Sequence, residues 1–144
     1  MREFVYHRAC SIDEACRLGA EDGAAFLAGG QTLLRDLKRG RRGAPASLVK
    51  ISGVVSREIG VRDGASTIGA GATHAEVAGA EVVRERLPAL AGLAGHVGDP
   101  AVRHRGTLGG ALAANEPAGD YPAADQPTSK YAGRRRHMGR CATS

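Results

Sequence analysis

The chain has 144 residues, a formal net charge of +5 and 42% hydrophobic residues, but no Trp, two Phe and three Tyr. Its length fits one domain with a core of mainly Ala, Val, Leu and Ile. No apolar run approaches the roughly 20 residues that cross a membrane, and no signal-peptide pattern occurs, so we expect a cytoplasmic protein without a membrane span. Most of the net positive charge lies in residues 125–144, which argues against nucleic-acid binding by the rest of the chain.

The first 27 residues predict a strand, a helix and a second strand. Alternation at residues 4–6 indicates the opening strand. Ser11 and Glu14 have the spacing of a capping box, which predicts a helix that starts after Ser11 and ends at Gly19. The apolar run Ala24–Leu27 then predicts a buried strand.

A glycine-rich segment, AGGQTL at residues 28–33, follows this strand, and we call it the first glycine loop. Glycine lets the backbone turn and approach a ligand closely, and polar Gln31 and Thr32 follow the glycine pair. This order is typical of a pyrophosphate-binding loop. A tight turn that binds nothing explains the same residues and stays open as an alternative.

The middle of the chain predicts short strands and a capped helix. The strands are expected at residues 48–51, 59–62 and 67–70. Asp63 and Gly64 favour a hairpin turn between the last two. Thr73 and Glu76 repeat the capping-box spacing before a helix that ends near Gly79. Helices and strands alternate without a regular βαβ rhythm, so we predict an α+β fold rather than a doubly wound sheet.

The segment GDPAVRHRGTLGGALAANEPAGDYP at residues 98–122 holds a second glycine cluster, and we call residues 106–110 the second glycine loop. We expect its backbone to turn with positive φ and to point consecutive N–H groups at one anion, to which Thr107 adds a hydroxyl donor. The run GALAAN predicts a helix whose N-terminus would favour a phosphate. A plain glycine-rich turn is again the alternative.

Other site patterns are incomplete. GAGATH at residues 69–74 starts like a dinucleotide fingerprint, but His74 replaces its third glycine. His96, Asp99 and His104 match no common metal-ligand spacing, so we predict no metal site.

The three cysteines, Cys10, Cys16 and Cys141, form no CxxC pair. We therefore expect incidental thiols rather than a zinc site or a disulfide framework. No side chain is a convincing catalytic acid, base or nucleophile, so no catalytic residue is predicted.

Five segments carry a family resemblance: FVYHRACSIDEACRLG, AGGQTL, LVKISGV, TIGAGATHAEVA and GDPAVRHRGTLGGALAANEPAGDYPAA. In this order, over residues 2–124, the chain resembles the FAD-binding medium subunit of molybdenum hydroxylases of the carbon monoxide dehydrogenase and xanthine dehydrogenase type. The resemblance implies a two-part FAD-binding module of the vanillyl-alcohol-oxidase (PCMH) type, which the family follows with a separate C-terminal domain.

By this resemblance FAD is the cofactor, and the two glycine loops hold opposite sides of its diphosphate. The matching residues are Ala28, Gly29, Gly30, Gln31, Thr32 and Leu33 in the first loop and Thr107, Gly109, Gly110 and Asp120 in and after the second. The resemblance implies donation by Thr107 to phosphate or flavin-side oxygens and acceptance by Asp120 from ribityl or ribose hydroxyls. Ala111 stands where the family often has Asn or Ser, so one polar contact is missing.

The resemblance also implies a function and partners. The chain would pass electrons from iron–sulfur clusters through FAD to an external acceptor, in a complex with a large molybdenum-cofactor subunit and a small iron–sulfur subunit. The alternative is a non-catalytic binding or assembly remnant without flavin.

We expect an FAD-binding subdomain over residues 1–55 and a second, partial one over residues 56–124. The remaining residues 125–144 are polar and Arg-rich, and we expect a disordered basic tail there instead of the family's further strands and C-terminal domain. A truncated or frame-shifted product, inactive by itself, is the corresponding hypothesis.

Overall fold

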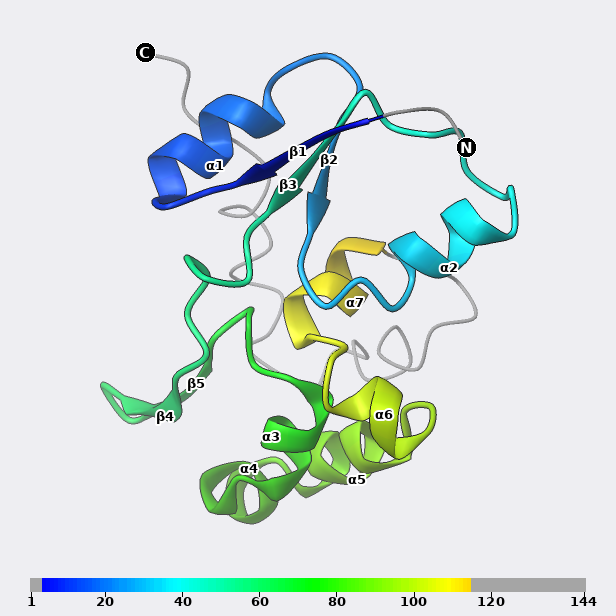
Figure 1. Cartoon of the computed structure of the whole chain (residues 1–144). Helices are drawn as coiled ribbons and strands as arrows, with labels where there is room; N and C mark the ends of the chain where they lie inside the picture. The colour runs from blue at the N-terminus through cyan, green and yellow to red at the C-terminus, as the bar shows by residue number, and fades with distance from the viewer. Residues whose placement is uncertain (1–3, 115–144) are drawn as a thin grey trace.

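The computed structural model describes residues 4–114, and Figure 1 shows their arrangement. The first half contains β1 (Val5–Arg8), α1 (Ile12–Gly19), β2 (Ala24–Leu27), α2 (Leu33–Lys38) and β3 (Ser47–Lys50). The second half contains β4 (Ile59–Arg62), β5 (Ala65–Ile68), α3 (His74–Gly79), α4 (Glu81–Arg86), α5 (Pro88–His96), α6 (Pro100–Arg103) and α7 (Leu108–Ala114). A small sheet, a separate hairpin and a group of helices together confirm the α+β class.

The first sheet is parallel, with β3 between β1 and β2. Its central residue Val49 is fully buried and lies opposite His7 and Phe26 on the two neighbouring strands. The first half is therefore a βαβαβ unit, which the sequence pattern did not predict. The rhythm is hard to detect because each strand has only four residues and α2 only six.

Helix α1 covers one face of this sheet. Ala15 and Leu18 of α1 pack with Ala9 and Val49 into a small apolar cluster. A Cβ at Gly19 would collide with the ring of Phe26, so the glycine lets that ring approach the end of the helix. Phe26 is still 47% exposed, so the prediction of a buried strand is wrong at this position.

The capping box predicted at the start of α1 forms only in part. The Ser11 hydroxyl accepts a hydrogen bond from the Glu14 N–H at 3.1 Å, as predicted. The Glu14 carboxylate, however, accepts from the N–H of Cys10 at 2.7 Å, one residue before the N-cap. The helix start is still capped, because two donors near its first turn are satisfied.

The two cysteines in the described part of the chain differ. Cys10 is exposed and free, whereas Cys16 on α1 is disulfide-bonded. The expectation of incidental thiols is therefore wrong for Cys16, since a disulfide requires proximity in space rather than a spacing along the chain.

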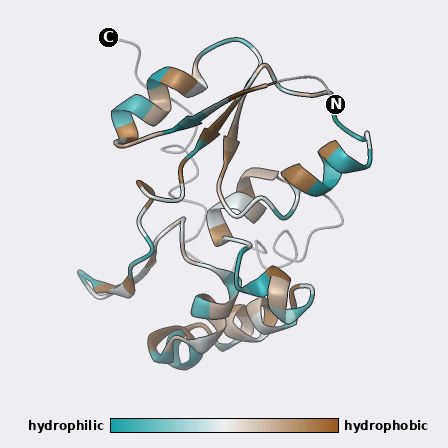
Figure 2. Cartoon of the chain, viewed as in Figure 1, coloured by the Kyte–Doolittle hydropathy of each residue, from teal (hydrophilic) through white to brown (hydrophobic). Residues whose placement is uncertain are grey.

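The second half is built on a hairpin and an apolar helical cluster. Asp63 and Gly64 both have positive φ, 52° and 75°, and form the predicted turn between β4 and β5. Helices α3, α4, α5 and α7 enclose the larger core cluster, whose buried members are Ala72, Val77, Val83, Leu90, Ala91, Ala94 and Leu108. In Figure 2 the strands β2 and β3 of the first half are coloured towards hydrophobic, whereas the tip of the hairpin is hydrophilic. None of the helices within residues 4–114 has the length and apolar character to span a membrane.

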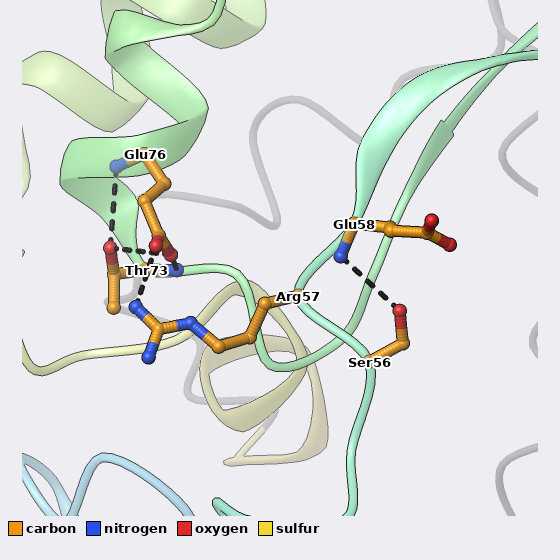
Figure 3. Close-up of polar contacts among 5 residues, drawn as sticks. All are labelled: Ser56, Arg57, Glu58, Thr73 and Glu76. Carbon is orange, nitrogen blue, oxygen red and sulfur yellow. Dashed lines mark hydrogen bonds and ion pairs between the residues drawn. The ribbon is translucent and has the colours of Figure 1, made fainter.

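The predicted capping box at the start of α3 is complete (Figure 3). The Thr73 hydroxyl accepts from the Glu76 N–H at 3.2 Å, and the Glu76 carboxylate accepts from the Thr73 N–H at 2.8 Å. Arg57, which precedes β4, donates to the same carboxylate at 2.6 Å. Partial burial raises the pKa of the Glu76 carboxyl, but the contacts with Thr73 and Arg57 outweigh it, so this pKa lies below its ordinary value.

We predict that Glu76→Gln destabilises the chain at pH 7 by about 1 kcal/mol or less, because one cap contact and an exposed ion pair are weakened. A lowered folded-state pKa stabilises the fold above the unfolded-state pKa, and this contribution is lost as the pH falls through the folded-state pKa. The difference between wild type and variant should therefore shrink between pH 7 and about pH 3.

Thermal unfolding followed by circular dichroism at the two pH values measures this effect. Glu85→Gln on α4 is a matched control, because Glu85 is exposed and makes no ion pair within the described residues. An equal loss for Glu76→Gln at both pH values would contradict the assigned role of the carboxylate.

Candidate functional site

The first glycine loop connects β2 to α2 and is half-buried throughout. Gly30 has φ +74°, so the chain turns tightly here, as both the pyrophosphate loop and its tight-turn alternative require. The carbonyls of Gly30 and Thr32 accept the first hydrogen bonds of α2, from Leu34 at 3.0 Å and Asp36 at 2.9 Å. Within residues 4–114, the N–H groups of Gly29, Gly30, Gln31 and Thr32 donate to no acceptor. The loop therefore leaves four consecutive backbone N–H groups without an acceptor in the described part of the chain, and consecutive N–H donors of this kind are typical of anion-binding loops.

The second glycine loop differs from its prediction. None of its glycines has positive φ, and Gly109 and Gly110 lie inside α7. Most of its N–H groups already have acceptors: Gly106 donates to the Val102 carbonyl, Leu108 to Ala72, Gly109 to Ala70, and Gly110 to the Thr107 hydroxyl. The expected row of N–H groups around an anion is therefore wrong here, because pairing with residues 70–72 and the first turn of α7 use these donors.

The two glycine loops are in direct contact. A Cβ at Gly29 would collide with the carbonyl of Arg105 and lie 3.0 Å from the Cα of Gly106. We call this contact between the two glycine loops the loop junction. Ala28 also lies at it, since a Cβ at Gly110 would be 3.8 Å from the Cβ of Ala28. Figure 1 shows α7 beside the connection between β2 and α2. The backbones can approach this closely at Gly29 only because this residue carries no side chain.

Thr107 lies at this junction and is 8% exposed. Its hydroxyl oxygen accepts from the Gly110 N–H at 3.1 Å, and its proton has no acceptor in the described part of the chain. A Cβ at Gly110 would come within 2.8 Å of that oxygen. The Gly110 N–H therefore orients the Thr107 hydroxyl, whose proton is left to donate a hydrogen bond; donation to a ligand stays a prediction.

Residues 69–74 hold the second glycine loop in place, a role that the sequence analysis missed. Thr73 and Thr107 form an isolated antiparallel bridge, and the His74 N–H donates to the Gly106 carbonyl at 3.0 Å. The buried His74 ring would lie 2.8 Å from a Cβ at Gly106, and a Cβ at Gly109 would lie 2.6 Å from that of Ala70. The glycines of GAGATH were the sequence feature that could have indicated this role. They allow close backbone packing, since a Cβ at Gly69 would collide with Ser56.

An open cavity of about 540 Å³ lies beside the first glycine loop. It is lined by Gln31, Pro100, Ala101, His104 and Arg105. Within residues 4–114, no group of His, Cys, Asp or Glu side chains has the arrangement of a metal site. Instead, the Asp99 carboxylate caps α6, while His96 and His104 bond to the carbonyls of Gly92 and Pro100.

The predicted site residues are thus largely brought together. Gly29 of the first loop meets the backbone at Arg105 and Gly106, directly before the second loop's Thr107, Gly109 and Gly110. The other residues predicted in the first loop, Ala28, Gly30, Gln31, Thr32 and Leu33, lie in the same connection between β2 and α2. Asp120 lies outside the described residues. Ala111, noted as a missing polar contact, packs against the apolar core of the second half.

The chain matches the family model "FAD binding domain in molybdopterin dehydrogenase" over residues 2–125. It is 39% identical over 124 residues to the carbon monoxide dehydrogenase medium chain of Hydrogenophaga pseudoflava, covering 83% of this chain and 42% of that one. It is 33% identical to the nicotine 6-hydroxylase medium subunit of Paenarthrobacter nicotinovorans, covering 81% and 42%. The chain thus spans less than half the length of these relatives.

Solved structures are similar over the same region. A carbon monoxide dehydrogenase from Hydrogenophaga pseudoflava that lacks the Mo-pyranopterin moiety superposes with a TM-score of 0.77 and 35% identity, over 85% of this chain and 44% of that chain. Quinoline 2-oxidoreductase from Pseudomonas putida 86 gives a TM-score of 0.70 and 36% identity, over 78% and 40%.

The junction predicts opposite effects for two glycine-to-alanine changes. Gly29→Ala should destabilise the chain by about 1–3 kcal/mol, because the new methyl group collides with the Arg105 carbonyl. Gly92→Ala on α5 should stabilise it by up to about 1 kcal/mol, because nothing lies near its Cβ position and alanine favours the helix. Denaturant unfolding measures both, and equal stabilities of the two variants would contradict the described contact.

Proposed function

The chain belongs to the family of FAD-binding domains of molybdopterin dehydrogenases, and on this basis we propose that it binds FAD with the diphosphate at the junction of its two glycine loops. The observation that carries this proposal is that the four N–H groups of Gly29–Thr32 have no acceptor among residues 4–114. A diphosphate has several acceptor oxygens and negative charge, so it suits a row of backbone donors. The residues of the first loop therefore fit the cofactor.

Thr107 supports the same placement from the opposite side. Its hydroxyl is buried at the loop contact, is held by the Gly110 N–H and keeps a proton to donate. Gly110 leaves room next to that hydroxyl, since a Cβ there would crowd it. The first loop would thus supply most of the N–H donors to the diphosphate. The second loop would supply a single donor, the Thr107 hydroxyl, and the Gly110 N–H that holds this hydroxyl in position.

We further propose that this is an electron-transfer subunit. FAD when bound supplies one-electron and two-electron redox chemistry, and the protein's share is to bind and orient it. Relatives are described as medium chains or medium subunits of carbon monoxide dehydrogenase and nicotine 6-hydroxylase. By analogy, the partners of this chain would be a large molybdenum-cofactor subunit and a small iron–sulfur subunit.

A boundary near residue 55 between two FAD-binding subdomains, 1–55 and 56–124, remains part of the proposal. Two separate apolar clusters support it. The smaller lies within the first half and includes Val54 at its margin, whereas the larger is built from the second half and has Ile59 at its margin. The two glycine loops would then come from different subdomains, with the cofactor between them.

A flavin-free assembly module is the second candidate. It is favoured by the second glycine loop, in which most N–H groups are already committed to protein acceptors. Fewer donors would then remain for a diphosphate than the sequence implied. Measurement of FAD binding separates the two candidates.

We expect the purified chain to bind one FAD, seen as a change of flavin fluorescence on titration. Thr107→Val should weaken FAD binding by about tenfold, since the donor at the junction is lost. Thr107→Ser keeps the hydroxyl and should bind FAD nearly as wild type does. Circular dichroism checks that each variant is folded. A folded wild-type chain that takes up no FAD would support the flavin-free module instead.

The proposed partners allow a separate test. On co-expression with the large and small subunits of a carbon monoxide dehydrogenase-type complex, we expect the chain to co-purify with them in equal amounts. Size-exclusion chromatography followed by subunit quantification measures this. A chain that binds FAD but elutes apart from both subunits would contradict the partner assignment and leave the cofactor assignment intact.

A further inference from the structure

The cavity beside the first glycine loop has a basic lining. Gln31 contributes from the first glycine loop, while Pro100, Ala101, His104 and Arg105 contribute from α6 and the residues that follow it. Among the described residues no carboxylate lines the cavity, and the nearby Asp99 carboxylate accepts from the Val102 N–H at 2.9 Å. The cavity therefore suits an anionic rather than a cationic ligand.

The backbone of Arg105 is fixed by packing, whereas its side chain has no partner within residues 4–114. Its carbonyl lies against Gly29, so the residue is fixed at the loop junction. Its guanidinium makes no hydrogen bond or ion pair within residues 4–114, and the residue is exposed. Three other arginines of the second half have partners: Arg57 pairs with Glu76, Arg86 donates to the Gly64 carbonyl, and Arg103 donates to the Gly98 carbonyl.

His104 is oriented by a single contact. Its Nδ1 lies 2.7 Å from the Pro100 carbonyl, and since a carbonyl only accepts, Nδ1 carries the hydrogen. The Nε2 atom has no partner among the described residues and remains available.

We propose that this cavity is a phosphate subsite in which the Arg105 guanidinium binds phosphate oxygens beside the N–H groups of the first glycine loop. A guanidinium matches the geometry of a phosphate with two parallel hydrogen bonds. This inference rests on the proposed function, because the diphosphate of FAD is the nearest source of such a group. It adds Arg105 to the binding residues, a position that the sequence analysis did not select.

The test compares ligands with and without phosphate. Arg105→Gln should weaken FAD binding by about tenfold or more and leave the affinity for riboflavin, which has no phosphate, unchanged. Arg84→Gln on α4 is the matched control. It removes the same charge from an exposed arginine outside the cavity lining, and its FAD affinity should equal that of wild type. Thermal unfolding confirms that both variants are folded.

Calorimetric titration with inorganic pyrophosphate makes the test independent of flavin binding. The wild-type chain should bind pyrophosphate, and Arg105→Gln should bind it about tenfold more weakly. If wild type binds pyrophosphate but no FAD, the subsite stands while the proposed function fails. If Arg105→Gln weakens the binding of pyrophosphate but not of FAD, the subsite binds the phosphate of another molecule.

Three results overturn the subsite. The first is that Arg105→Gln binds both FAD and pyrophosphate as wild type does. The second is that its affinity for riboflavin falls by the same factor as its affinity for FAD, which would indicate a general structural effect. The third is that the wild-type chain binds neither FAD nor pyrophosphate.

Discussion

The contact between Gly29 and the backbone at Arg105 and Gly106 is the constraint on which the candidate site depends. It joins a loop of the parallel sheet to a loop of the helical half, across more than 70 residues of chain. Any side chain at Gly29 would force the two backbones apart, because protein interiors have little free volume to absorb an extra methyl group. The site is therefore a place where the two halves of the fold meet.

Support for this contact comes from a third segment. The N–H groups of Leu108 and Gly109 donate to Ala72 and Ala70, and these residues lead directly into the capped start of α3. The Thr73 and Glu76 cap, with Arg57, thus fixes the segment on which the second glycine loop rests (Figure 3). Each interaction is weak by itself, but all of them restrain the same short stretch of backbone.

The local elements follow from the sequence because their causes are local. The turn at Asp63 and Gly64, the cap at Thr73 and the tight turn at Gly30 depend on residues within four positions of one another, and all three form as predicted. The parallel order of the first sheet and the exposure of Phe26 were not predictable in this way. They depend on which strands pair and which faces remain uncovered, and four-residue strands carry little information about either.

By itself, the sequence determined the family, the α+β class and most of the residues that meet at the loop junction. The tertiary structure decided what each of them can do. The second glycine loop has glycines for close backbone packing, and most of its N–H groups donate to Val102, Ala70, Ala72 or the Thr107 hydroxyl. Within residues 4–114, the row of N–H groups without acceptors therefore lies in the first loop. Only the fold places Arg105, whose side chain has no partner within residues 4–114, in the same cavity lining as Gln31. The reason is that a glycine pattern shows where a backbone approaches something closely, whereas the identity of the approaching group depends on residues far away in the chain.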